Sequence, residues 1–74
     1  MTGGELRAIR DRLRMSQTDF GKVVGAHWTR VSAWERTDKV PHHAALLACL
    51  MVSDPVVCDR IEKMVGLKQE RETA

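Results

Sequence analysis

Hydrophobic residues recur along most of this chain at spacings of three and four, which is the period of an amphipathic helix. They predict five helices, over about residues 4–13, 17–24, 28–36, 42–52 and 55–65. No stretch alternates polar and apolar residues as a strand does, and residues 68–74 are charged and lack apolar anchors. The pattern therefore predicts a compact all-α domain of four or five helices over residues 1–67, followed by a flexible charged tail over 68–74.

Polar residues and glycines mark the ends of these helices. Thr2 and Glu5 have the spacing of a capping box, and the hydroxyl of Ser16 can cap the second helix. Gly25 is a natural left-handed stop between the second and third helices. Asp54-Pro55 combines an N-cap with proline at the first helical position, so a fifth helix is expected over residues 54–65.

The last two helices are the most apolar. The fourth carries one apolar stripe, formed by Ala45, Leu46, Cys49 and Leu50. Cys49 and Cys58 lie in apolar stretches of a chain with no sign of secretion, so buried, reduced thiols are expected. The fifth helix has more apolar side chains than a four-helix core can cover. They either form a dimer interface or close the core of the monomer, and the need of a small domain for extra burial favours the dimer. The residues concerned are Val56, Val57, Ile61 and Met64.

Length and charge narrow the classes of protein that fit. Seventy-four residues make one domain, near the lower limit for a core that folds alone. The net charge is +2, and the first 43 residues hold eight Lys or Arg against five acids, whereas residues 44–74 hold four against five. No apolar run approaches the roughly 18 residues of a membrane span, and the N-terminus lacks a signal-peptide pattern, so a cytoplasmic location with no membrane contact is expected.

The third predicted helix has an unusual polar side. At about 100° per residue, Val31 and Trp34 lie on the core side. Trp28, Thr29, Ser32, Ala33 and Arg36 share the other side. Solvated helix faces usually prefer Lys and Glu. Hydroxyls, alanine and an aromatic edge suit the major groove of DNA instead, where they meet base edges and thymine methyl groups.

Residues 6–50 resemble the lambda-repressor-like (Xre/Cro) helix-turn-helix family. The matching pieces keep the family's order and spacing, and they are Leu6-Arg7-Ala8-Ile9-Arg10, Met15-Ser16-Gln17, residues 20–25, residues 31–36 and Pro41. Three positions depart from the pattern. Thr37 stands where the family favours Gly, which predicts a less tight loop after the third helix. Gly21 replaces a usual Ala, which predicts a looser second helix, and its lack of a side chain is expected to let the backbones of the second and third helices approach where they cross. Trp28 is large for its position.

The resemblance implies a bundle that binds double-stranded DNA as a homodimer, with its third helix in the major groove. It implies base-facing positions at Gln17, Trp28, Thr29, Ser32 and Ala33. It also implies a structural ion pair between Arg10 and Glu35, which joins the first helix to the third. Contacts with DNA phosphates are expected from Ser16, Gln17, Arg30, Arg36, Lys39 and His42.

No enzyme chemistry is indicated. His27, His42, His43, Cys49 and Cys58 lack the converging spacing of a zinc site, and no glycine-rich phosphate loop occurs. No catalytic residue, metal or cofactor is expected. The sequence predicts a DNA-binding transcriptional regulator, an autoregulating repressor that binds an inverted-repeat operator. The alternative is a protein-interaction module, such as an antitoxin that binds a partner protein through Trp28 or the last helix.

Overall fold

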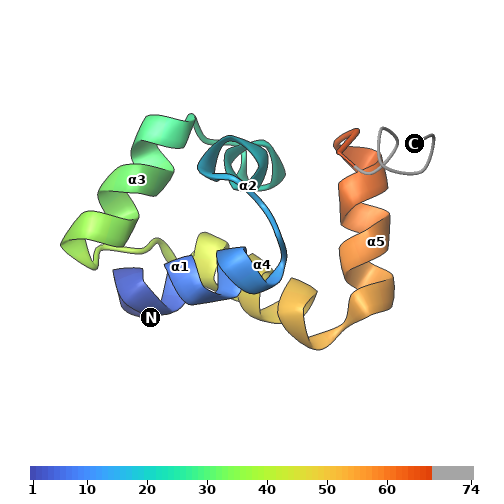
Figure 1. Ribbon diagram of the computed structural model, residues 1–74, viewed down its shortest axis with the longest axis horizontal. Coiled ribbons are helices and arrows are strands. Elements are labelled where there is room, and N and C mark those ends of the chain that lie inside the picture. The colour runs from blue at the N-terminus through green and yellow to red at the C-terminus, as the bar shows by residue number, and fades with distance from the viewer. Residues whose placement is uncertain (68–74) are drawn as a thin grey trace.

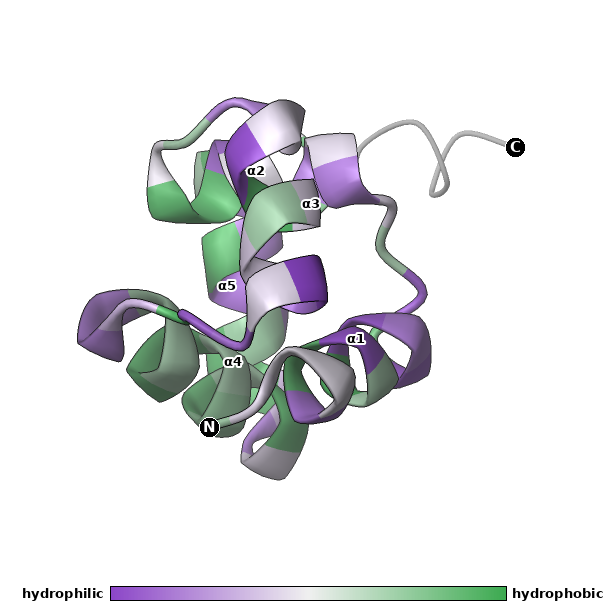
Figure 2. Ribbon diagram, turned by 90° about the vertical axis from the view of Figure 1, so that its left-hand side faces the viewer, coloured by the Kyte–Doolittle hydropathy of each residue, from purple (hydrophilic) through white to green (hydrophobic). Residues whose placement is uncertain are grey.

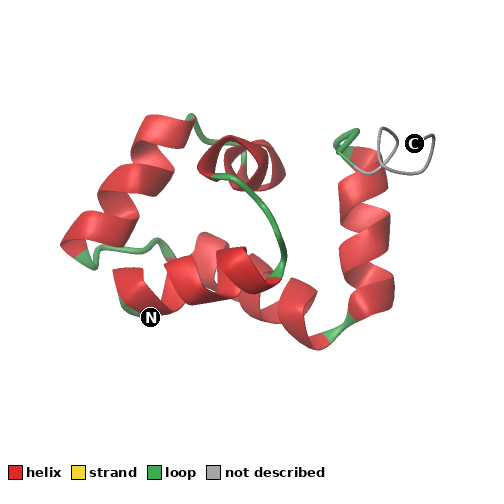
Figure 3. Cartoon of the chain, viewed as in Figure 1, coloured by secondary structure: helices red, strands yellow, loops and turns green. Residues whose placement is uncertain are grey.

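The computed structural model describes residues 1–67, which form five helices and no strand (Figures 1 and 3). The helices are α1 (Gly3–Arg12), α2 (Gln17–Val24), α3 (Trp28–Thr37), α4 (His42–Ser53) and α5 (Pro55–Met64). The all-helical prediction is confirmed, and every bound lies within one residue of the expected one. The predicted tail, residues 68–74, lies outside the described residues.

The helices begin and end at the residues with capping chemistry. The Thr2 hydroxyl accepts a hydrogen bond from Glu5 N, while the Glu5 carboxylate accepts one from Thr2 N. Ser16 caps α2, and Gly25 ends that helix with φ of 73°, in the left-handed region that glycine favours. Asp54 accepts from the amides of Val56 and Val57 at the start of α5. These local signals account for the accuracy of the bounds.

The core lies where α1, α2, α3 and α4 converge. Its fully buried side chains are Leu6, Phe20, Val31, Ala44, Ala48 and Met51, with Met15 nearly so. α2 and α3 pack mainly on each other, α1 lies against α3 and α4, and α5 packs mainly on α4. Figure 1 shows the result: α3 and α5 stand at opposite ends of the molecule. None of the helices within residues 1–67 is both long and apolar enough to cross a membrane.

The buried face of α4 is not the predicted one. Ala44, Ala48 and Met51 are buried, whereas Leu46, Cys49 and Leu50 are exposed. α4 has no charged residue and is apolar over most of its circumference (Figure 2), so the sequence pattern does not distinguish its two faces. The face with two alanines lets neighbouring helices approach closely, and the chain packs that side. The expectation that Cys49 is buried was therefore wrong, although both cysteines are free thiols.

Gly21 is required by close packing. A Cβ atom at this position would overlap the carbonyl oxygen of Ala26, in the turn between α2 and α3. The expectation that Gly21 lets the backbones of α2 and α3 approach closely is confirmed, because alanine does not fit there without a shift of the backbone.

The C-terminal end of α3 also differs from expectation. The helix continues through Thr37, whose hydroxyl donates to the carbonyl of Ala33 at 2.7 Å. Asp38 takes the left-handed position with φ of 61°. The helix is thus one residue longer, and a residue with a short polar side chain ends it.

Candidate functional site

The predicted face of α3 is accessible to different degrees along its length. Val31 is fully buried, and Trp34 packs against the core from the same side. On the other side, Thr29 is exposed and Trp28 keeps 46% of its surface in solvent. Ser32 and Ala33 are half-buried. The first turn of α3 is therefore the part most open to a ligand.

His27 organises this first turn. Its Nδ1 accepts a hydrogen bond from Thr29 N at 3.3 Å and lies 2.9 Å from the Thr29 hydroxyl. Because Nδ1 accepts from an amide, the ring proton belongs on Nε2. The His27 ring also lies beside Trp28, with 5.7 Å between ring centroids. The contact of the His27 ring with the Thr29 side chain was not predicted from the sequence.

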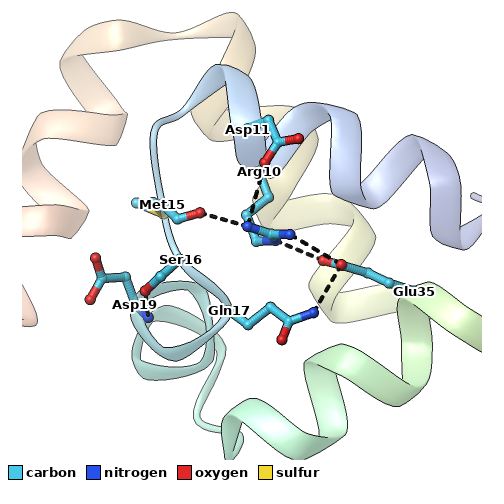
Figure 4. Close-up of polar contacts among 7 residues, drawn as sticks. All are labelled: Arg10, Asp11, Met15, Ser16, Gln17, Asp19 and Glu35. Atoms are coloured by element: carbon cyan, nitrogen blue, oxygen red, sulfur yellow. Dashed lines mark hydrogen bonds and ion pairs between the residues drawn. The ribbon is translucent and has the colours of Figure 1, made fainter.

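The other end of α3 is held by a buried polar network (Figure 4). Arg10 of α1 donates hydrogen bonds to both carboxylate oxygens of Glu35, with Nε–Oε2 at 2.8 Å and Nη2–Oε1 at 3.2 Å. Only 11% of the Arg10 side chain and 7% of the Glu35 side chain are exposed. Arg10 Nη1 also donates to the carbonyl of Met15 at 2.8 Å. The hydrogen bonds that Arg10 donates to Glu35 raise the pKa of Arg10, so the guanidinium stays charged despite its burial.

Gln17 belongs to the same network. Its amide Nε2 donates to Glu35 Oε1 at 3.2 Å, so this end of the side chain faces the protein (Figure 4). Gln17 was expected to face bases and phosphates. In this structure one N–H of its amide braces the carboxylate of Glu35 in α3, and the expected contacts with DNA stay a prediction.

A second contact joins α1 to the end of α3, and it was not predicted from the sequence. The Gly3 amide donates to Asp38 Oδ1 at 2.7 Å. A Cβ atom on Gly3 would overlap the backbone carbonyl of Glu35, so the two helices touch through their main chains. In the sequence, the signal for this contact was a glycine at the start of one helix and an aspartate at the end of another.

The remaining residues expected at phosphates are spread around α3. Arg30, Arg36, Lys39 and His42 are exposed. Ser16 is exposed too, but its hydroxyl accepts from Asp19 N at 3.0 Å and so serves α2 as a cap. His43, next to His42, lies edge-on to Trp34 with 6.3 Å between ring centroids. α4 therefore begins beside the C-terminal half of α3, with His42 exposed there.

The four residues expected at a dimer interface differ in their exposure to solvent. Ile61 and Val57 are half-buried, and Ile61 packs against the core. Val56 is 66% exposed and Met64 is 84% exposed. Of the two roles expected for the fifth helix, closure of the core applies to Ile61. Val56 and Met64 are exposed, so they stay available for a dimer interface.

Within residues 1–67, no three His, Cys, Asp or Glu side chains gather into a set that could hold a metal ion. No family model, no curated protein and no solved structure matches the chain. The interpretation of the site rests on its own geometry.

Proposed function

We propose that this chain is a sequence-specific DNA-binding transcriptional regulator. In this proposal α2, the turn at Gly25 and α3 act as a helix-turn-helix, and α3 enters the major groove. A homodimer binds an inverted-repeat operator near the protein's own gene and represses it by covering the promoter. Two copies of α3 about 34 Å apart would match half-sites separated by one turn of DNA.

The observation that carries the proposal is the contrast between the two sides of α3. One side is fixed by Val31 and by the buried Arg10–Glu35 pair, so the helix has a defined orientation. On the opposite side Trp28 and Thr29 are exposed to solvent, and Ser32 next to them is half-buried. Hydroxyls can hydrogen-bond to base edges, and the edge of an indole can contact a thymine methyl group.

The charges around this face support phosphate contacts. Arg30, Arg36 and Lys39 are exposed on and just after α3, and His42 lies at the start of α4. Cations in these positions would hold the DNA backbone on either side of the groove and fix the register of the helix.

The first test is binding to the DNA directly upstream of the protein's own gene, by fluorescence anisotropy at 50 and 200 mM salt. We expect tight binding that resists an unrelated duplex and weakens steeply with salt, because each phosphate contact adds about 0.9 to the slope of log K against log salt. Weak binding that the unrelated duplex removes would contradict an operator at this place.

Substitutions on α3 then separate base reading from backbone binding. Ser32→Ala should relax base preference at one position, at a cost of about 1–3 kcal/mol for the preferred base. Lys39→Ala should instead weaken binding to all duplexes alike and lower the salt slope by about 1. Unchanged affinity in both Ser32→Ala and Arg36→Ala would show that α3 does not face DNA.

A second candidate function is supported by Trp28. An indole that is 46% exposed beside the His27 ring is a suitable anchor for a partner protein. In that case the chain would be a protein-interaction module, such as an antitoxin. Binding to a partner would survive high salt and be lost in Trp28→Ala, whereas operator binding would be absent.

A further inference from the structure

A polar hollow lies beside the accessible face of α3, between the first turn of α1, the start of α2 and the C-terminal half of α3. Its volume is about 360 Å³. Arg7, Ser32 and Arg36 line it together with the backbone of Gly3 and Gly4, and the Arg10–Glu35 pair forms part of its wall. Arg7 has no role among the residues considered so far.

The charge of this hollow is positive. It contains three arginines and one carboxylate, and that carboxylate is already bound by Arg10 on two oxygens and by Gln17. Among the described residues, Arg7 and Arg36 form no ion pair with a carboxylate, and both are exposed. Two guanidinium groups therefore border one hollow without an ion-pair partner among residues 1–67. The other carboxylate next to the lining, that of Asp38, accepts the hydrogen bond of the Gly3 amide.

The wall near Gly4 leaves room for an anion to approach the main chain. A Cβ atom on Gly4 would meet nothing nearer than the Thr2 hydroxyl at 4.0 Å. Gly4 lies in the first turn of α1, where the helix dipole attracts negative charge. The Gly3 amide in this turn donates to Asp38 and the Glu5 amide donates to Thr2, so the amide of Gly4 is the one that faces an incoming anion. The Ser32 hydroxyl adds a further donor from the opposite side.

We propose that this hollow binds a phosphate group, with Arg7 and Arg36 as its cationic ligands. Guanidinium groups match phosphate oxygens in geometry as well as in charge. The inference rests on the proposed function for the source of that phosphate, which is the DNA backbone. Ser32 and Arg36 belong to both the hollow and the face of α3, so a duplex seated on α3 brings its backbone to the hollow. α1 thereby becomes a third contact element beside α2 and α3.

The test compares Arg7→Gln with Arg12→Gln. Arg12 is an exposed arginine of the same helix that does not line the hollow, so both variants lose the same charge from α1. We expect Arg7→Gln to lower the salt slope of duplex binding by about 1 and Arg12→Gln to leave it unchanged. Equal slopes in the two variants, with the wild type still binding DNA, would overturn the inference and leave the proposed function intact.

A second measurement identifies the source of the phosphate. Amide signals of Gly3 and Gly4 are followed by ¹H–¹⁵N NMR while an upstream-DNA duplex or inorganic phosphate is added. Shifts with duplex that Arg7→Gln removes would support the DNA backbone. Shifts with inorganic phosphate alone, lost in Arg7→Gln, would support the site but overturn DNA as its source. Unmoved glycine signals with both probes would overturn the phosphate site itself.

Discussion

α3 and α5 are both ten residues long, but they are attached to the domain in different ways. α3 is joined to α1 by the Arg10–Glu35 pair and by the contact between Gly3 and Asp38, and it buries Val31 completely. α5 packs mainly on α4, and its N-cap comes from Asp54, directly before it in the chain. The open side chains of α3 are polar and aromatic, whereas Val56 and Met64 on α5 are apolar.

The two kinds of attachment have different physical consequences. Buried ion pairs and main-chain contacts are directional, so they hold α3 at one angle to the body of the domain. Such pairs contribute little net stability over apolar replacements, and their effect is mainly on geometry. Apolar contacts are not directional. Contacts of this kind suit a helix that completes a core and offers its remaining apolar surface to another copy.

Removal of Glu35 should lower the unfolding free energy more than any other change to the attachment of α3 or α5. Glu35→Ala leaves the buried guanidinium of Arg10 without its partner, which costs about 3–5 kcal/mol in unfolding free energy. Asp11→Ala is the control, because this carboxylate lies 3.5 Å from the same arginine but is 62% exposed. It should cost less than about 1 kcal/mol. Urea denaturation followed by circular dichroism measures both.

A double variant separates orientation from stability. Arg10→Met with Glu35→Leu should recover most of the lost stability, because apolar residues of similar volume fill the same site. It should still bind the operator less tightly than the wild type, because α3 loses its directional contacts. Equal destabilisation by Glu35→Ala and Asp11→Ala would show that the network does not anchor α3.

Local chemistry made the helices predictable. The Thr2–Glu5 pair, Ser16, Gly25 and Asp54-Pro55 act within a few residues of themselves, so their effect can be deduced from the sequence. The core side of α3 was deducible for a similar reason, because Val31 and Trp34 stand out from their polar neighbours. The orientation of α4 was not, since a helix without charges offers no pattern that selects a face.

The contacts of the candidate site depend on residues far apart in the chain. Gly3 and Asp38 are separated by 35 residues, and Gln17 and Glu35 by 18. Gln17 is a case in point, because its position at the start of α2 was deducible but the direction of its amide was not. The hollow beside Arg7 arises only when α1, α2 and α3 pack together. The spacing of apolar residues along the chain does not indicate that these three helices will enclose a hollow.

The next largest effects on stability are expected from substitutions of Gly3 and Gly4, the two neighbouring glycines of α1. In Gly3→Ala the added methyl group would overlap the carbonyl of Glu35, so we expect a loss of about 1–3 kcal/mol as α1 and α3 move apart. Gly4→Ala, one residue later, meets open space and should stabilise the helix by about 0.5–1 kcal/mol. Thermal unfolding measures the opposite signs. A loss in both variants would mean that glycine is needed for another reason than the contact with α3.

On α5 we expect smaller effects on stability, and these should differ between substitutions of Ile61 and of Met64. Ile61 is half-buried against the core, so Ile61→Ala should cost about 1–2 kcal/mol. Met64 is 84% exposed, and Met64→Ala should change monomer stability by less than about 0.5 kcal/mol.

Sedimentation equilibrium of the wild type and of Met64→Asp tests whether α5 forms a dimer interface. If α5 forms the dimer interface, Met64→Asp dissociates the dimer without unfolding the domain. A monomeric wild type at micromolar concentration would contradict the dimer and leave α5 as a closing helix only.

The smallest effect concerns the first turn of α1, which carries the Gly3 contact to the end of α3. The Thr2 amide donates to the Glu5 carboxylate at 2.8 Å, and this bond, aided by the Thr2 hydroxyl, lowers the pKa of Glu5 below 4.5. A lowered pKa in the folded state stabilises the protein above the ordinary pKa, and that contribution is lost as pH falls through the folded value. Glu5→Gln should therefore be slightly less stable than the wild type at pH 7, and the difference should vanish at about pH 2. Unfolding midpoints of the two proteins across this range test the sign. A difference that persists in acid would place the role of Glu5 in its packing and not in its charge.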